Sequence, residues 1–423
     1  MLYRCRVVDD VLDAVFPDLA AIALEGAKGV GKTATASQRA ATVFSLTDAN
    51  QRALVAADLN LVTQAAPPVL IDEWQLQPDV WDRVRTAVDD DPSGGRFLLT
   101  GSAGVAPGIR IHSGAGRIVS LMMRPMSFAE RGVAEPTVSL RGLLAGADSP
   151  IQGESSLGLV GYVDEILRSG FPGIRGLPDL ARELQLDSYI TRIVERDLPE
   201  SGVSVRRPQA LRDWLAAYAA ATATNASYTA ILDAATAGYS DKPARQTVAG
   251  YREHLQRIFV LEPLEAWIPS FSPLRRLTVA PKHHLVDPAL AARLVGVGEA
   301  GLLRGQGARA STETGTWLGA LFESLVTQSV RAYAGAARAE VRHMRTKENR
   351  HEIDLIVERR DRRCLAIEVK LGGAASDGDV THLNWLHDQL GDRLIDRLVV
   401  NTGPHAYRRR DGVAVVPLAL LGP

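Results

Sequence analysis

The stretch "LEGAKGVGKTATAS", residues 24–37, decides the fold of the first third of this chain. It fits the pattern G-x-x-x-x-G-K-[ST] without a mismatch, follows the apolar run "LAAIALE", and precedes an Ala-rich segment without Gly or Pro. A strand, a glycine loop and a helix in that order predict a loop that cradles phosphates. The residues expected to bind the nucleotide are Gly26, Ala27, Lys28, Gly29, Val30, Gly31, Lys32 and Thr33.

The residue types of this loop suit phosphate binding. Glycines let backbone N–H groups close around phosphate oxygens, Lys32 adds a positive charge, and Thr33 offers a hydroxyl to Mg²⁺ at the start of the helix. The alternative is a glycine-rich turn that binds nothing, and the flanking strand and helix count against it. We therefore expect ATP and Mg²⁺ at this loop.

A second motif, "PVLIDEWQ" at residues 68–75, fits a buried strand that ends in two acids, as a Walker B strand does. Asp72 is expected to hold Mg²⁺, and Glu73 is expected to polarise the attacking water as a general base. Taken alone, the pair would also fit a solvated strand end.

A third apolar run, "RFLLTGSA" at residues 96–103, ends in Thr100 and Ser102, which are polar groups suited to orienting a γ-phosphate or a water. In doubly wound sheets, ligands bind outside the carboxyl ends of the strands. The three strand ends therefore predict one crevice in an α/β domain with a parallel P-loop sheet, over residues 1–135.

Two arginines follow in "SGAGRIVSLMMRPMSFAE". Arg117 and Arg124 are placed where a cation could neutralise transition-state charge, including on the nucleotide of a neighbouring subunit. A solvated surface role is the alternative for either one. Arg117 is the candidate arginine finger, and it implies a homo-oligomer or a partner protein.

Composition sets limits on the rest of the chain. At 423 residues, more than one domain is expected. The 48 basic and 49 acidic residues nearly cancel, so any nucleic-acid binding must come from local clusters. The two cysteines, Cys5 and Cys364, match no metal spacing and fit a reduced compartment. The acidic start suits no signal peptide, and the longest charge-free run, residues 214–232, is too polar for a membrane span, so we expect a cytoplasmic protein.

The middle of the chain is expected to be helical. Residues 136–157 are rich in Gly, Ser and Pro and predict a linker, and residues 158–310 predict a helical and winged-helix domain that includes an amphipathic helix over residues 179–199. On the expected recognition helix, Arg245, Gln246 and Arg252 could meet DNA phosphates or base edges. The alternative is that this helix packs between domains and leaves the arginines solvated.

The last domain, residues 311–423, opens with a helix whose apolar face carries Leu318, Leu321, Leu325 and Val326. Glu323 lies among these residues. It either pairs with an arginine or reaches inward toward a metal site, and pairing is the simpler alternative.

Two strands then follow in "HEIDLIVERRDRRCLAIEVKLGG". Asp354 and Glu368 could share Mg²⁺, with Lys370 on the same face polarising a water or a scissile phosphate, in a pattern that resembles the PD-(D/E)XK nuclease fold. Alternating charges on an exposed hairpin would look alike. Basic residues surround these strands and suit nucleic acid: Arg342, Arg345, Lys347, Arg350, Arg359, Arg360, Arg362, Arg363, Arg408, Arg409 and Arg410.

Taken together, these motifs resemble a widespread group of bacterial and archaeal AAA-type P-loop ATPases that carry a C-terminal domain of unknown function. The resemblance runs almost end to end through "GVGKT", "PVLIDEWQLQP", "FLLTGSAG", "SGFPG", "APKHHLVDPALAARLVG", "ALFESLV" and "HEIDLIVE…AIEVK". It implies ATP binding by the glycine loop, Mg²⁺ and water handling by Asp72 and Glu73, sensing by Ser102, and a finger role for Arg117. One departure is Lys28-Gly29, where the group usually has Arg-Gln.

Two functions of different classes fit this sequence. The first is a Mg²⁺-dependent ATPase that acts on, or is regulated by, nucleic acid and drives a restriction-endonuclease-like C-terminal domain. The second is a nucleotide-gated regulatory switch, of a toxin–antitoxin or signalling kind, whose nuclease fold is only a binding surface. Replacing Asp354 separates them if DNA is cut, because a nuclease needs its metal ligands.

Overall fold

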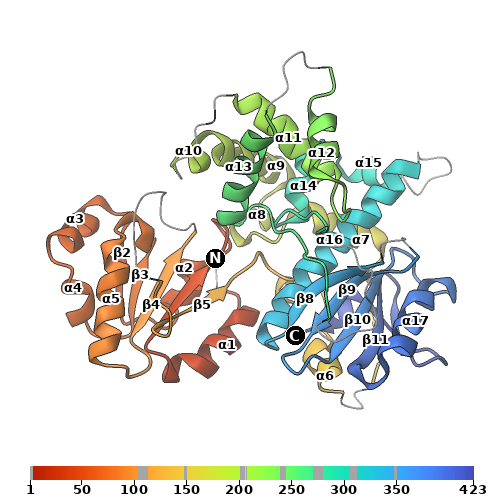
Figure 1. Cartoon of the computed structure of the whole chain (residues 1–423), viewed down its shortest axis with the longest axis horizontal. Coiled ribbons are helices and arrows are strands. Elements are labelled where there is room, and N and C mark those ends of the chain that lie inside the picture. Colours follow the sequence, from red (N-terminus) through yellow and green to blue (C-terminus); the bar gives the residue numbers. More distant parts are fainter. Residues whose placement is uncertain are drawn as a thin grey trace. The chain divides into compact units, whose positions relative to one another are not determined.

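The computed structural model describes residues 3–102, 113–146, 150–200, 205, 207–238, 244–269, 280–304, 312–346 and 350–423 (Figure 1). Contacts divide the chain into two compact units. The first unit comprises Met1–Pro125, Ile193–Val205 and Ala249–Val260, and the second comprises Met126–Arg192, Arg206–Val248 and Leu261–Pro423. This grouping differs from the domain boundaries expected from sequence, which remain a prediction.

The first unit contains a five-stranded parallel sheet in the order β2-β3-β4-β1-β5. In chain order the strands are β1 (Ala21–Glu25), β2 (Thr42–Ser45), β3 (Val69–Asp72), β4 (Phe97–Gly101) and β5 (Ile118–Met122). The register aligns Asp72 with Thr100 and aligns Glu25 with both Gly101 and Met122. All five strands therefore end at the same edge of the sheet, as the sequence predicts for the strands that carry the motifs.

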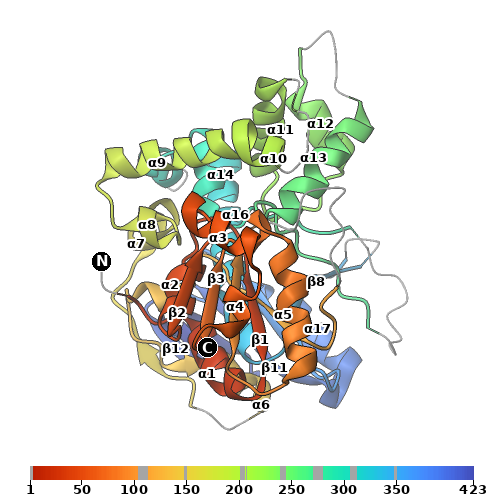
Figure 2. The same ribbon diagram turned by 90° about the vertical axis from the view of Figure 1, so that its left-hand side faces the viewer.

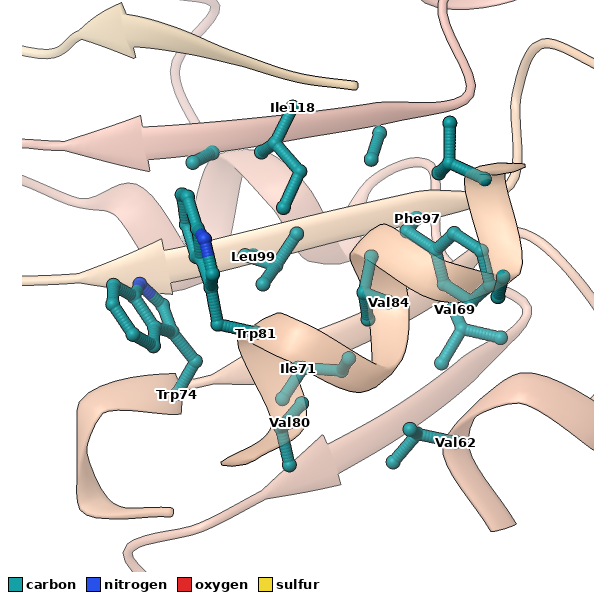
Figure 3. Packing of buried hydrophobic residues seen from close by; sticks show 14 of the residues in the cluster. Val62, Val69, Ile71, Trp74, Val80, Trp81, Val84, Phe97, Leu99 and Ile118 are labelled. Carbon is teal, nitrogen blue, oxygen red and sulfur yellow. The ribbon is translucent and has the colours of Figure 1, made fainter. Parts of the chain in front are cut away.

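Helices cover both faces of this sheet. They are α1 (Val7–Val15), α2 (Lys32–Ser37), α3 (Ala49–Ala57), α4 (Leu61–Gln64) and α5 (Asp79–Asp90), with short 3-10 turns at Phe16–Asp18 and Trp74–Leu76. On one face, Trp81 and Val84 of α5 pack with Ile71, Leu99 and other buried residues (Figure 3). Figure 2 shows α5 beside the strands. The other face is covered by a cluster that contains Leu12 and Phe16. Each fully buried aliphatic side chain contributes about 1.5–3 kcal/mol, so the two layers hold the strand ends in place.

Two later segments belong to this first unit. One contains the π-helical turn Ile193–Asp197 and α10 (Leu198–Glu200), and the other contains the second half of α13 (Arg245–Arg257). Helix α9 (Asp179–Arg192), before the π-helical turn, and α11 (Pro208–Ala220), after α10, belong to the second unit. The chain therefore passes from the second unit into the first and back.

The expected middle helices form in the second unit and along α13. Besides α9 and α11 they include α7 (Leu159–Arg168), α8 (Pro172–Arg175), α12 (Tyr228–Ala235), α14 (Pro288–Val295) and α15 (Glu299–Arg304). A 3-10 turn, Ala129–Arg131, precedes them in the chain. After α12 and α13, isolated antiparallel bridges join Leu261 to Leu285 and Leu264 to Lys282. This order is the one expected for a winged helix, while the winged-helix assignment and DNA binding remain predictions.

A mixed seven-stranded sheet, ordered β7-β12-β13-β11-β10-β9-β8, forms the rest of the second unit. A long helix α16 (Thr312–Ala336) precedes β8 (Glu340–Arg345), β9 (Glu352–Glu358) and β10 (Cys364–Val369), which pair antiparallel. Helix α17 (Thr381–Leu390) then leads to β11 (Leu394–Asn401), which lies parallel to β10. The remaining elements are β12 (His405–Arg408), β13 (Ala414–Pro417), β14 (Leu421–Gly422) and 3-10 turns at Gly378–Val380, Gly391–Arg393 and Leu418–Leu420.

Residues 136–157, expected to be a linker, contain regular structure where they are described. Strand β6 (Val138–Ser139) pairs with β14, strand β7 (Gly153–Glu154) pairs with β12, and between them lies α6 (Leu140–Ala145). The expectation failed because Gly, Ser and Pro dominate the composition, while the helix is specified by only three leucines at helical spacing. Leu140, Leu143 and Leu144 are buried.

The described helices were also compared with the length and hydropathy that a bilayer requires. Among them, none is long and apolar enough to cross a membrane.

Candidate functional site

The glycine loop connects β1 to α2 at the carboxyl edge of the parallel sheet. Gly26 has φ +148°, and a Cβ atom there would lie 2.1 Å from the carbonyl oxygen of Met123, so only glycine fits. Gly31 caps α2 at φ +105°. The loop is shaped by backbone conformations that residues with side chains rarely adopt, as a phosphate-binding loop requires.

Lys32, the first residue of α2, lies inside the loop. Its Nζ donates to the carbonyl oxygens of Gly26 and Ala27, at 2.8 Å each, and the residue is 4% exposed. Burial lowers the pKa of Lys32 to about 8, although the carboxylates of Glu73 and Asp72 act in the opposite direction. A largely desolvated ammonium in this position favours a multiply charged anion as its partner.

Asp72 joins the loop to the sheet. Its Oδ1 accepts hydrogen bonds from the hydroxyls of Thr33 and Thr100, both at 2.6 Å, and only 8% of Asp72 is exposed. A hydroxyl and a carboxylate within hydrogen-bond distance are hard oxygen donors that can share one Mg²⁺. Thr33 and Asp72 therefore fit the metal that the sequence predicts here.

The carboxylate of Glu73 has different hydrogen-bond partners from that of Asp72. Its Oε2 accepts from Ser102 Oγ at 3.3 Å and from Gln75 Nε2. Its backbone is left-handed, with φ +54° and ψ +48°, which is strained for a residue with a side chain. With this backbone turn, the Glu73 carboxylate meets Ser102 and Gln75, whereas the Asp72 carboxylate meets Thr33 and Thr100.

Two contributors to this site were not found from the sequence. Gln75 ends the quoted Walker B stretch, two residues after Glu73, but that stretch predicts no role for it. Arg6, which is buried, donates from Nη1 to the carbonyl of Val30 at 2.7 Å and from Nη2 to the carbonyl of Arg124 at 2.8 Å. Its guanidinium thus ties the glycine loop to the segment after β5. No local sequence signal could reveal this contact, because it exists only in the folded chain.

The departure at Lys28-Gly29 has a structural counterpart. Gly29 has φ +81°, a conformation that glycine adopts without strain. Lys28 Nζ lies 2.6 Å from Asp197 Oδ1 in the π-helical turn, within the same compact unit. The glycine loop is therefore connected to the later segment by an ion pair, in which the Lys28 side chain is 47% exposed.

Arg117 is not brought to the glycine loop of its own unit. It precedes β5, whose first residue pairs with Ala21 at the start of β1, so it lies at the amino edge of the sheet. Its Nε is 2.7 Å from Asp89 Oδ1. Arg124, by contrast, follows the carboxyl end of β5. A finger role for Arg117 on a neighbouring subunit stays a prediction.

In the second unit, acidic side chains converge on Lys282. Its Nζ lies 2.8 Å from Glu323 Oε1 of α16, 2.8 Å from Asp354 Oδ1 of β9, and 3.1 Å from Glu352 Oε1 of β9. Glu323 therefore reaches inward, as one sequence alternative held, but it pairs with a lysine. Burial opposes the charge, yet the Asp354 and Glu323 carboxylates raise the pKa of Lys282 well above its ordinary value.

Glu368 and Lys370 complete this cluster. Lys370 Nζ donates to Glu368 Oε2 at 3.0 Å, and the backbone N–H of Val369 donates to Asp354 Oδ2 at 2.9 Å. Burial, and then the Asp354 charge, raise the pKa of Glu368 well above its ordinary value. Its Oε1 is buried and accepts no hydrogen bond from the described residues. The sequence prediction that Asp354, Glu368 and Lys370 meet on one face agrees with this geometry.

The cluster, as arranged, does not fit the predicted Mg²⁺. The carboxylate oxygen of Asp354 that would ligate a metal already faces the Lys282 ammonium, and a cation cannot be added beside another at that distance without strong repulsion. Over the described ranges, no group of three or more His, Cys, Asp or Glu side chains is arranged to hold a metal. The predicted metal role of Asp354 and Glu368 therefore lacks support here.

The basic residues around the cluster are largely engaged with acids of the same unit. Ion pairs join Arg342 to Glu340, Arg345 to Glu352, Arg359 to Asp361, Arg362 to Glu358, Arg408 to Asp396 and Arg409 to Asp377. Lys347 lies outside the described residues. Much of the positive charge that suggested nucleic acid is thus balanced within the protein.

These features define the class of the first domain. A P-loop nucleotide-binding domain has these features: a glycine loop after an interior parallel strand, an acid at the end of β3 and polar groups at the end of β4. Residues 19–132 match the AAA domain family. The match supports the AAA-type P-loop domain that the sequence predicts there. Residues 160–301 and 318–421 match two domains of unknown function, DUF8612 and DUF4143.

Similar proteins extend over most of the chain. The uncharacterized proteins Rv2008c of Mycobacterium tuberculosis and Mb2031c of Mycobacterium bovis are each 26% identical over 354 residues, which is 82% of this chain and 68% of theirs. Among solved structures, the Walker-type ATPase PABY2304 of Pyrococcus abyssi aligns with 68% of this chain and 94% of its own, at 15% identity and a TM-score of 0.40.

Proposed function

We propose that the protein binds ATP with Mg²⁺ at the glycine loop and hydrolyses it. The observation that carries this proposal is the pair of contacts at the sheet edge. Asp72 bonds to Thr33 at the start of α2, while Glu73, next in the chain, bonds to Ser102 on the neighbouring strand. Two adjacent acids are thus given separate surroundings, as a metal ligand and a general base require.

Each residue then has a defined task. The backbone N–H groups of the loop and the Lys32 ammonium bind the β- and γ-phosphates. Thr33 and Asp72 would hold Mg²⁺, which neutralises charge on the phosphate oxygens when bound. Glu73 accepts the proton of the attacking water at its carboxylate, and Ser102 and Gln75 hold that carboxylate in place.

Steady-state ATP hydrolysis and ATP affinity, measured together, test these roles. Lys32→Ala should lose both, because the buried charge that meets the phosphates is gone. Glu73→Gln should bind ATP as the wild type does and lose about 10²–10⁴-fold in turnover, the usual contribution of a general base. Asp10→Asn is the matched control, since Asp10 is an exposed acid of the same unit. Normal turnover in Glu73→Gln would remove the general-base assignment.

A nucleotide-gated switch is supported by a second observation. The ion pair from Lys28 reaches Asp197 in the π-helical turn. That turn and the short α10 after it belong to the first unit, whereas α9 and α11 belong to the second. Short π-helical turns within helices are frequent at functional sites. We propose that the nucleotide state alters this turn and, through the continuous chain, the helices on either side.

Hydrogen exchange of residues 193–200 with and without saturating ATP tests the switch. Exchange in this segment should change on ATP binding, and the change should be smaller in Lys28→Ala and in Asp197→Ala. Their double variant should be no worse than either single variant, because both remove one interaction. Exchange that is insensitive to ATP in the wild type would sink the switch proposal.

For the C-terminal domain, we propose a nuclease-like fold that binds without cutting. A helix, three antiparallel strands, a helix and a parallel strand, with Asp354, Glu368 and Lys370 on one face, support a PD-(D/E)XK-like arrangement. The ammonium of Lys282 among the acids supports a binding surface over a catalytic centre. DNA is one candidate partner, and Arg245, Gln246 and Arg252 of the expected winged-helix domain, which precedes this domain in the chain, could meet it too. DNA cleavage that disappears in Asp354→Ala would restore the nuclease hypothesis.

A further inference from the structure

We propose that Lys282 is the resident cation of the C-terminal acidic cluster, formed by Glu323, Glu352, Asp354 and Glu368, and that it holds the position a divalent metal ion would otherwise take. The proposal is independent of ATP hydrolysis. It predicts that the wild-type domain excludes divalent ions from this cluster, and that removing the lysine creates a site for a hard cation such as Mg²⁺ or Mn²⁺.

The hydrogen-bonding capacity of the ammonium is matched by its surroundings. A lysine ammonium has three donors, and three carboxylates lie within 2.8–3.1 Å of Lys282 Nζ. They come from α16 and from β9, which are separate elements of the second unit. Only 2% of Lys282 is exposed, so water cannot replace these partners. The charge is therefore compensated entirely by this cluster in the described structure.

Lys282 is also held by its backbone. Its N–H donates to the carbonyl of Leu264 at 2.9 Å, and the N–H of Leu264 donates back to the carbonyl of Lys282 at 2.8 Å. The next two residues are fixed as well, with His283 Nε2 bonded to the carbonyl of Ala226 and His284 Nδ1 to Ser324 Oγ. The lysine thus enters the cluster from an anchored segment, which distinguishes it from a flexible side chain that happens to reach an acid.

The oxygen atoms around the ammonium are of the kind that divalent cations prefer. Glu323, Glu352 and Asp354 supply the carboxylate oxygens that contact it, and Glu368 lies on the adjacent strand β10. Hard oxygen donors of this kind suit Mg²⁺ and Mn²⁺. Glu368 Oε1 is the second, independent indication, because it is buried and has no hydrogen-bond partner among the described residues. Polar atoms in such a state are rare in folded proteins, so this oxygen is available to a cation that enters when the lysine is removed.

The test compares Mn²⁺ binding by the full-length protein without nucleotide, counted by electron paramagnetic resonance, with thermal unfolding measured in parallel. Wild type and Asp354→Asn should bind the same amount of Mn²⁺, since any ion at Asp72 is common to both. Lys282→Ala should unfold at a lower temperature without metal, bind about one additional Mn²⁺ per chain, and recover stability as Mn²⁺ is added.

Two control variants locate the effect. Lys282→Arg keeps a cation and should gain no Mn²⁺, and Lys282→Ala with Asp354→Asn should lose the additional ion and its rescue. The proposal is overturned if the wild type holds a Mn²⁺ that Asp354→Asn lacks, or if Lys282→Ala folds and gains none. Should Lys282→Ala fail to fold at every Mn²⁺ concentration, the comparison of wild type with Asp354→Asn still decides whether the cluster excludes the metal.

Discussion

The affinity for ATP should weaken as the pH rises above about 8, because Lys32 then loses its proton. Burial lowers the pKa of this ammonium to about 8 in the free protein, whereas its ordinary value is 10.5. Bound phosphates would favour the charged form and hold the proton on Lys32. ATP binding and proton binding at this residue are therefore linked, and each strengthens the other.

The size of the effect follows from that pKa. With a pKa of about 8, the apparent dissociation constant rises about twofold at pH 8 and about tenfold at pH 9, which is about 1.4 kcal/mol per pH unit. The stability of the free protein changes with pH in the opposite direction to the ATP affinity. The unfolded chain keeps the Lys32 proton up to its ordinary pKa of 10.5, while the folded chain releases it from about 8, so this residue makes the free protein more stable as the pH rises between those values.

Isothermal titration calorimetry of ATP binding from about pH 8 to pH 9.5, where the terminal phosphate of the nucleotide is already almost fully ionised, measures this dependence. Buffers of different ionisation enthalpy should reveal net proton uptake. Lys32→Arg is the control, because a guanidinium stays charged throughout and should give a flat profile at the same net charge. A flat profile in the wild type, or an equal slope in Lys32→Arg, would refute the linkage.

Three further variants probe the loop and the assembly. Gly26→Ala places a Cβ against the Met123 carbonyl at a positive φ, so the free energy of unfolding in urea should fall by about 1–3 kcal/mol. An unchanged value would argue against the backbone conformation observed at Gly26. Arg6→Ala removes the charged hydrogen bonds to the Val30 and Arg124 carbonyls, which should lower the free energy of unfolding by about 1.5–3 kcal/mol and weaken ATP binding. Unaltered affinity would mean the loop does not need this support. If Arg117 acts on a neighbouring subunit, turnover per chain should rise with protein concentration in the wild type and stay low in Arg117→Ala, and equal rates would exclude that role.

The nucleotide domain could be predicted closely because its signals are local. The glycine pattern, the strand-end acids and the polar end of β4 are each contained in a few consecutive residues. The rule that parallel strands end at one edge of the sheet then brings the three motifs together. The bond between Asp72 and Thr100 is the kind of contact that this rule implies. Arg6 could not be assigned a role, since nothing beside it in the sequence marks the loop carbonyl it contacts. Gln75 ends the Walker B stretch, but its bond to Glu73 depends on the backbone turn after β3, which the motif does not specify.

The acidic cluster shows where local reasoning ends. Asp354, Glu368 and Lys370 could be placed together from two neighbouring strands, because alternation fixes which side chains share a face. Lys282 comes from a segment far away in sequence, and its role depends on the bridge to Leu264 and on the packing of α16. A site that resembles a metal centre in sequence can therefore be filled by a side chain that no motif includes.

Hydrolysis of ATP in the presence of Mg²⁺, with the glycine loop intact or altered, is the most direct test of the central claim. Purified wild-type protein is expected to release inorganic phosphate at a rate that Lys32→Ala and Glu73→Gln abolish, while Glu73→Gln still binds ATP. Phosphate release that persists unchanged in both variants, or a wild type that neither binds nor hydrolyses ATP at any protein concentration, would contradict it.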